Sequence, residues 1–316
     1  MTKIRVSAPG KIHLLGEHAV VYGMPAILSA VNKRLFVEIY YSVERRIFVD
    51  KIYKKQIISL LAILEKEIKR RTNIREIRPY SIEVKSEAPI GSGVGSSAAL
   101  SASITAALLL LLKAPWDKKT IFDIAYEGEK FFHGNPSGGD LATVIEGGFL
   151  WFRKEFEFLK TFSSLPFKPH KNIKQFILIN SGKPKESTRE MVEKVAKLKK
   201  QFPQKVKSLF FSQEELTKNM ALALKDGDEE SLINCIKMGE YNLEKLGVVG
   251  RKARLIIRKI EKLGGAAKIS GAGGVKDGSG ILLAYHKSSA ILNKFFLHFK
   301  LESSKIALGE EGLREE

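Results

Sequence analysis

The chain has a single cysteine, Cys235, among its 316 residues. This excludes an internal disulfide framework and is compatible with a reducing compartment. Long apolar runs are also missing: the longest, residues 104–112, is far shorter than the roughly 20 residues that span a bilayer. The first residues contain no apolar core of signal-peptide length. We therefore expect a cytoplasmic protein that does not bind a membrane, with Cys235 as a small buried residue on a helix.

Metal-ligand spacing is absent as well. Five of the six histidines show no such spacing with one another or with the cysteine, so we predict no zinc site; they are His13, His133, His170, His286 and His298. Acidic residues are fewer than basic ones, which leaves a net charge of +18. Such a charge suits an anionic partner, such as a nucleotide, a phosphorylated metabolite or a nucleic acid. The lysines are scattered among glutamates along predicted helices, however, and this pattern is more typical of solvated helix faces.

The order of predicted elements favours the α+β class. Strands and helices follow one another without regular βαβ alternation. Strands are expected at 4–8, 35–41, 46–50, 81–85, 147–152 and 176–180, and helices at 53–71, 98–112 and 118–132. Helices then fill 185–263, with breaks near 202–203 and 246–247, before a closing strand, loop, strand, helix and strand at 266–307. Prolines at 166 and 169 indicate a boundary between two domains, 1–165 and 166–316.

A glycine-rich stretch precedes the apolar helix expected at 98–112. Glycines 91, 93 and 95 alternate and lead into Ser96 and Ser97. Alternating glycines let backbone N–H groups converge, and a helix N-terminus capped by one of the serines would attract an anion. The stretch lacks the Gly-Lys-Ser/Thr ending of a P-loop and does not match the dinucleotide pattern. A phosphate cradle and a capped helix after a flexible loop remain equal alternatives.

Three charged residues are candidates for chemistry near such a cradle. Glu129 precedes His133 by four residues, so the two share a helix face, and Asp140 follows a polar glycine-proline turn. Carboxylates there would ligate Mg²⁺ and assist an acceptor hydroxyl, whereas the simpler interpretation makes them a surface residue and a helix cap. Lys11, after Pro9 and Gly10, would stabilise developing negative charge or simply end a strand.

A second glycine cluster occupies residues 270–280 and precedes a strand-like run at 281–285. Two glycine-rich loops nearly 180 residues apart suggest a site that is assembled between two domains.

Three segments, in this order, resemble the motifs of the GHMP kinase superfamily: residues 8–23, 89–99 and 270–280. The run Gly-Glu-His-Ala-Val-Val-Tyr-Gly at 16–23 is most similar to the mevalonate kinases of that superfamily. The run His-Gly-Asn-Pro-Ser-Gly-Gly-Asp at 133–140 is similar to their catalytic segment, and residues 242–248 to their C-terminal domain. The resemblance covers essentially the whole chain.

The resemblance implies a two-domain GHMP kinase fold: an N-terminal domain like ribosomal protein S5 domain 2, a ferredoxin-like C-terminal domain and an ATP site between them. It implies an ATP- and Mg²⁺-dependent kinase that converts mevalonate to 5-phosphomevalonate at its C5 hydroxyl, for isoprenoid synthesis. It also implies a homodimer whose partners are ATP and mevalonate.

Individual roles also follow from the resemblance. Asp140 matches the catalytic aspartate that accepts the hydroxyl proton, and Lys11 matches the lysine beside it. Glu129 and Ser97 match the Mg²⁺ ligands, with Ser96 as the adjacent alternative. The mevalonate end of the site is matched by Glu17, His18 and Ala272, and Thr188 matches a threonine near the catalytic centre. The ATP-binding positions are Pro89, Gly91, Ser92, Gly93, Val94, Gly95, Ser96, Ser97 and Ala98.

The chain departs from the family pattern at two places. Ser270 stands where a threonine is usual, and residues 275–277 (Val-Lys-Asp) separate the glycines of the third loop. Gly139 stands where an apolar residue usually precedes the aspartate. These departures bear on the acceptor more than on the reaction. Two alternatives therefore remain: a GHMP kinase for phosphomevalonate or a sugar, and a nucleic-acid-binding protein, although no basic motif interleaved with aromatics supports the latter.

Overall fold

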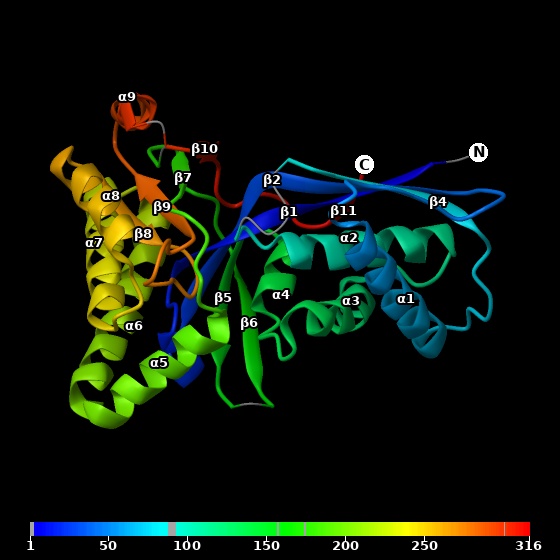
Figure 1. Cartoon of the computed structure of the whole chain (residues 1–316), viewed down its shortest axis with the longest axis horizontal. Helices are drawn as coiled ribbons and strands as arrows, with labels where there is room; N and C mark the ends of the chain where they lie inside the picture. The colour runs from blue at the N-terminus through cyan, green and yellow to red at the C-terminus, as the bar shows by residue number, and fades with distance from the viewer. Residues whose placement is uncertain (1–2, 88–92, 157, 174, 300) are drawn as a thin grey trace. The chain divides into compact units, whose positions relative to one another are not determined.

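The computed structural model describes the chain except residues 1–2, 88–92, 157, 174 and 300 (Figure 1). Its contacts divide the chain into two compact units. The first unit comprises Met1–Lys11, Ala30–Gly148 and Glu310–Glu316, and the second comprises Ile12–Ser29 and Phe149–Gly309. The division of the chain into domains at residue 165 stays a prediction.

The first unit combines sheet strands with four helices. The strand order is β11-β1-β2-β4-β3, where β1 is Ile4–Leu15, β2 Ala26–Tyr41, β3 Arg46–Phe48, β4 Tyr80–Ser86 and β11 Arg314–Glu315. β2 and β4 are antiparallel, in a register that runs from Leu35 opposite Ser86 to Tyr41 opposite Tyr80. The helices are α1 (Lys54–Arg71), α2 (Ser96–Leu111), α3 (Lys118–His133) and α4 (Gly139–Glu146), which gather on one side of these strands (Figure 1).

Helix α2 is the centre of the hydrophobic core in the first unit. All of its residues are buried except Ser97 and Leu110, as its continuous apolar sequence predicts. Leucines and isoleucines of α1 and α3 pack around it, together with the apolar face of β2 and β4. The N-terminal end of α2 is therefore anchored in this core.

The second unit contains a four-stranded antiparallel sheet in the order β10-β7-β9-β8. Its strands are β7 (Phe176–Asn180), β8 (Ala266–Ile269), β9 (Ile281–Tyr285) and β10 (Ser303–Ile306). Its helices are α5 (Thr188–Gln201), α6 (Pro203–Asp226), α7 (Glu229–Lys245), α8 (Arg251–Lys262) and α9 (Ser289–Phe299). A short 3-10 helix, η1 (Ala19–Tyr22), and the hairpin of β5 (Phe149–Lys154) and β6 (Lys160–Leu165) complete it.

Most predicted elements are confirmed, and the differences have local causes. β1 continues through Pro9 because the fixed φ of proline is compatible with extended backbone. The helical region has a further break at Gly227, which adopts a left-handed φ of 77° before Asp228 caps α7. Helix α4 and strand β6 were not predicted, since α4 has only eight residues and β6 is mostly exposed. The α+β class is confirmed.

Among the described residues, no helix is long and apolar enough to cross a membrane.

The buried position of α2 gives a stability prediction. Leu108 has no exposed surface, so Leu108→Ala should lower the free energy of unfolding by about 3 kcal/mol through lost burial and a residual cavity. Ile58 lies on α1 of the same unit and is 47% exposed, so Ile58→Ala is the matched control and should cost less than about 1 kcal/mol. Denaturant titration measures both. Equal effects would contradict the central position of α2.

Candidate active site

Lys11 lies on β1 in the first unit and is almost completely buried, with 6% of its surface exposed. Its backbone N–H donates to the carbonyl oxygen of Val94 at 2.8 Å, which joins the strand to the glycine-rich loop. Its side-chain ammonium lies 2.7 Å from Oδ2 of Asp140. The two residues predicted to be catalytic are therefore in direct contact within one unit.

Gly95 makes room for the aliphatic chain of Lys11. It has a left-handed φ of 74°, and a Cβ placed on it would lie only 2.5 Å from Cγ of Lys11. Gly95 is also the N-cap of α2, without a side-chain cap. The expectation that Ser96 or Ser97 caps the helix is therefore wrong, because both serines lie inside its first turn. The N-terminus of α2 therefore has no side-chain cap and lies beside the aliphatic chain of Lys11.

Asp140 lies in the first turn of α4, just after the polar turn at 134–138. Gly138 is the N-cap of that helix, with φ of 84°, so Asp140 is not the cap itself. A negative charge in the first turn interacts favourably with the helix dipole. Gly139, the unusual residue before the aspartate, is buried as the first residue of α4. The turn therefore directs a partly exposed carboxylate towards Lys11.

Glu129 lies on α3 and is 2% exposed. Its two carboxylate oxygens are 3.5 Å from the hydroxyl of Ser97 and 3.4 Å from that of Ser101. Burial raises the pKa of Glu129 to about 7, and the nearby charge of Asp140 adds to this, while Ser97 and Lys11 oppose it. The carboxyl groups of Glu129 and Asp140 thus both lie close enough to the buried ammonium of Lys11 to be influenced by its charge.

His133 extends this cluster, and no role for it follows from the sequence reasoning. Its Nε2 is 2.9 Å from the hydroxyl of Ser97 and 3.8 Å from Oε2 of Glu129. Burial lowers the pKa of the His133 imidazole. The four-residue spacing between Glu129 and His133 predicts that they share a helix face. This prediction is confirmed, because both side chains reach Ser97 from the same face of α3.

Three of the predicted ATP-binding residues lie outside the described part of the chain: Pro89, Gly91 and Ser92. The other six are described and run continuously from the loop into α2: Gly93, Val94, Gly95, Ser96, Ser97 and Ala98. Val94 and Ala98 are buried, whereas Gly93 is exposed.

A second cluster lies in the second unit and contains Glu17, His18 and Ala272. Glu17 and His18 are buried, and His18 has a positive φ of 60°, which is uncommon for a residue with a side chain. Its Nε2 lies 2.9 Å from the carbonyl oxygen of Ala272. Because a carbonyl only accepts, Nε2 carries the proton and Nδ1 is left as an acceptor. Burial lowers the pKa of His18, which favours this neutral form.

The substitution of threonine by Ser270 preserves a hydroxyl with two partners. The N–H of His13 donates to Oγ of Ser270 at 3.0 Å, and the hydroxyl donates to the carbonyl oxygen of His13 at 3.1 Å. The third glycine loop is thus hydrogen-bonded to His13, which lies in the part of β1 that belongs to the second unit. A serine makes both bonds without the extra methyl group of threonine.

The inserted residues of the third loop are held by the segment that precedes α5. Glu186 accepts from the backbone N–H groups of Val275 at 3.4 Å and Lys276 at 3.2 Å. Lys185 lies 2.9 Å from the carboxylate of Asp277. Thr188 follows as the first residue of α5 and is exposed. Its role near the catalytic centre stays a prediction.

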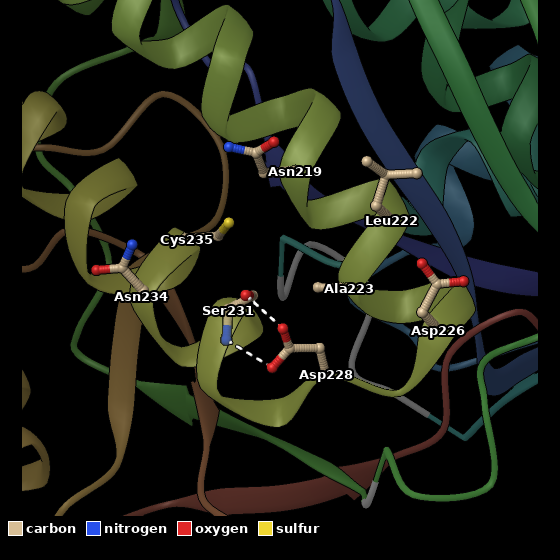
Figure 2. A pocket seen from close by; sticks show the side chains of 8 residues that line it. All are labelled: Asn219, Leu222, Ala223, Asp226, Asp228, Ser231, Asn234 and Cys235. Atoms are coloured by element: carbon tan, nitrogen blue, oxygen red, sulfur yellow. Dashed lines mark hydrogen bonds between the residues drawn. The ribbon is translucent and has the colours of Figure 1, made fainter.

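A cavity of about 260 Å³ lies between α6 and α7, and none of the residues that line it is one predicted for the site (Figure 2). Its carboxylate Asp228 caps α7, accepting from the N–H and hydroxyl of Ser231, and these bonds lower the pKa of Asp228. Cys235 also lines the cavity, and burial raises the pKa of its thiol to about 11. The thiol is therefore the unreactive, buried group that the sequence predicts.

Comparisons with known proteins give a family model and similar sequences. Residues 54–148 match the family model of the GHMP kinases N terminal domain. A mevalonate kinase of Archaeoglobus fulgidus is 36% identical over 272 residues, which cover 85% of this chain and 88% of that protein.

Solved structures show the same fold. The Methanococcus jannaschii mevalonate kinase has a TM-score of 0.81 at 21% identity and covers 98% of this chain and 99% of its own. The L. major mevalonate kinase, solved in complex with R-mevalonate, has a TM-score of 0.80 at 20% identity, with 99% of this chain and 97% of its own covered.

The N-terminal family match, the extent of the sequence identity and the shared GHMP kinase fold lead to one assignment: the chain belongs to the mevalonate kinase family.

Proposed function

We propose that this chain transfers the γ-phosphoryl group of ATP to the C5 hydroxyl of mevalonate. The observation that carries this proposal is the contact of the buried Lys11 ammonium with Asp140, beside Gly95 at the start of α2. Membership of the mevalonate kinase family supports mevalonate as the acceptor. Phosphoryl transfer depends on positioning and charge neutralisation rather than covalent chemistry, and this arrangement provides both.

Asp140 and Lys11 would act on the acceptor hydroxyl. As its oxygen forms a bond to the γ-phosphorus and the bond between that phosphorus and the leaving ADP oxygen breaks, the hydroxyl proton passes to the carboxylate of Asp140. Lys11, 2.7 Å from that carboxylate, would stabilise the negative charge that develops on the attacking oxygen. The polar turn before α4 would hold the carboxylate in place for this transfer.

The loop before α2 would bind the ATP phosphates. This proposal includes the nine predicted positions between Pro89 and Ala98. Support comes from Gly95, the N-cap of α2, which places no side chain over the end of the helix, and from the dipole of this 16-residue helix.

Glu129 and Ser97 fit a magnesium ion by their donor chemistry. Mg²⁺ prefers carboxylate and hydroxyl oxygens and keeps several waters and phosphate oxygens as further ligands. Burial and the charge of Asp140 raise the pKa of Glu129, and a divalent cation there would relieve both effects. Among the described residues, no set of three or more His, Cys, Asp or Glu side chains could enclose a metal. When bound with ATP, Mg²⁺ would neutralise phosphate charge.

The acceptor end would be formed by Glu17, His18, Thr188 and Ala272. Nδ1 of His18 would accept a hydrogen bond from an acceptor hydroxyl, because Nε2 donates to the carbonyl oxygen of Ala272. A cytoplasmic homodimer is part of the same proposal.

An acceptor screen tests the reaction. ADP release in the presence of ATP and Mg²⁺ should be rapid with mevalonate, and kcat/KM should be at least about 100-fold lower with phosphomevalonate or galactose. The departures in the third loop make this the critical comparison. Turnover with another acceptor but none with mevalonate would overturn the proposal.

Lys11→Met tests the role of the ammonium. We expect kcat to fall about 100-fold or more, with a change in the KM for ATP of less than about threefold, because the charge stabilises the transition state. Lys118 pairs with Glu146 at 2.6 Å in the same unit and is exposed, so Lys118→Met is the matched control and should retain activity. Steady-state kinetics in which KM for ATP rises while kcat is unchanged would refute the assignment.

Glu129→Gln tests the metal site. The amide keeps the shape of the side chain but loses its charge, so half-maximal activity should require about tenfold more Mg²⁺. Glu127 lies on the same helix and pairs with Lys130 at 2.8 Å, and Glu127→Gln serves as the control. A Mg²⁺ titration that is the same for both variants would exclude Glu129 as a ligand.

A further inference from the structure

Lys268 is a lysine with no exposed surface, and the proposed chemistry does not use it. It lies on β8 in the second unit, and its ammonium donates to the carboxylate of Glu17 and, at 2.5 Å, to the carbonyl oxygen of Ile269. A buried ammonium is costly unless it is paired, so the carboxylate of Glu17 is fixed by this contact. Glu17 is one of the residues proposed to bind the acceptor.

Glu240 is a second fully buried titratable residue, on α7, which packs against β8. Its Oε2 accepts from the backbone N–H of Ile269 at 2.9 Å. β8 is the last strand of its sheet, so one edge of Ile269 has no neighbouring strand to bond with. Lys268 and Glu240 together satisfy the carbonyl and the N–H of Ile269 there.

Ile269 is the last residue of β8, and the third glycine loop begins immediately after it. Ser270 is bonded to His13, and Ala272 to His18, so the loop and the residues around Glu17 share one set of contacts. Contacts that hold Ile269 and Glu17 in place therefore also position the third glycine loop and the residues around Glu17. The positive φ of His18 requires such support, since it costs on the order of 1–3 kcal/mol.

Stability alone is a poor explanation for this arrangement. Buried ion pairs contribute little net stability, and an apolar residue at position 268 would often serve a core as well. One oxygen of each carboxyl group, Oε2 of Glu17 and Oε1 of Glu240, is buried with no hydrogen-bond partner among the described residues. A network that leaves such groups unsatisfied costs free energy, which points to a functional use.

We propose that Lys268 and Glu240 are positioning residues for the acceptor end, which hold Glu17 and the start of the third glycine loop in the geometry that binds the acceptor alcohol. This inference rests on the proposed function, because it concerns how the same site recognises mevalonate. Neither residue touches the substrate; each acts through Glu17 or Ile269.

The protonation of Glu240 supports this role. Burial raises its pKa to about 8, and Glu244 and Glu17 add to the effect, while the Ile269 N–H and Lys268 oppose it. Glu244 is itself paired with Arg258 of α8 at 2.5 Å. A pKa of about 8 makes Glu240 mainly neutral at pH 7, which leaves the single pair of Lys268 and Glu17. At higher pH the ionisation of Glu240 adds a second negative charge near Glu17, which then competes with Glu17 for the ammonium of Lys268.

The test compares the KM values for mevalonate and for ATP in four variants. Lys268→Met should raise the KM for mevalonate about tenfold or more and leave that for ATP within about twofold. Glu240→Ala should act in the same direction. Glu240→Gln should resemble the wild type at pH 7, because the amide oxygen still accepts from Ile269. Tyr285→Phe, which removes a buried bond to Glu229 elsewhere in the same sheet, is the control and should change neither KM.

A pH series adds a readout that a purely structural role does not give. The KM of the wild type for mevalonate should increase between pH 7 and 9 relative to that of Glu240→Gln. Equal changes in both KM values, or a loss of folded protein without a change in either, would overturn the inference even though the wild type phosphorylates mevalonate. If Lys268→Met does not fold, the comparison of Glu240→Ala with Glu240→Gln decides. A wild type without mevalonate turnover would overturn the proposed function first, and this inference with it.

Discussion

The contact between the ammonium of Lys11 and the carboxylate of Asp140 is the interaction on which the proposed chemistry depends. It needs a buried lysine, and the lysine needs the space that Gly95 leaves by lacking a Cβ. Gly95 in turn is held by α2, the most deeply buried helix of the first unit. The hydrophobic core thus positions Gly95, Gly95 leaves room for the lysine, and the lysine contacts the aspartate. In the proposed mechanism, a change in any of these three would alter the position of the catalytic groups.

Charge is handled differently in the two clusters. Around Glu129 and Asp140, two carboxyl groups share one ammonium, and the excess negative charge suits a divalent cation that arrives with ATP. Around Glu17, the ammonium of Lys268 is fully buried, and burial raises the pKa of Glu240 to about 8, so that it is mainly neutral at pH 7. The first cluster is therefore arranged to gain a cation, whereas the second is balanced before any ligand binds. This difference fits a phosphate-binding role for the first and an alcohol-binding role for the second.

The sequence predicted the fold class, most elements and the pairing of Lys11 with Asp140, because these follow from periodicity and from motifs that resemble a known family. It did not predict Lys268, Glu240 or the bond of His133 to Ser97. Lys268 lies in a short strand and looks like an ordinary surface lysine until the fold buries it. Capping of α2 by a serine failed as a prediction because a glycine with positive φ already occupies that position. The sequence also did not reveal that Glu186 binds the inserted residues Val275 and Lys276, because this contact forms only in the folded chain.

The central claim is that Asp140 takes the proton of the mevalonate hydroxyl while Lys11 stabilises the charge. Its most direct test is the transfer of labelled phosphate from ATP to mevalonate in a single turnover, for the wild type and Asp140→Asn, with ATP binding measured in parallel. The amide keeps the shape of the side chain but accepts no proton, so the transfer should be at least about 1,000-fold slower with ATP affinity nearly unchanged. Transfer within tenfold of the wild-type rate would contradict the account.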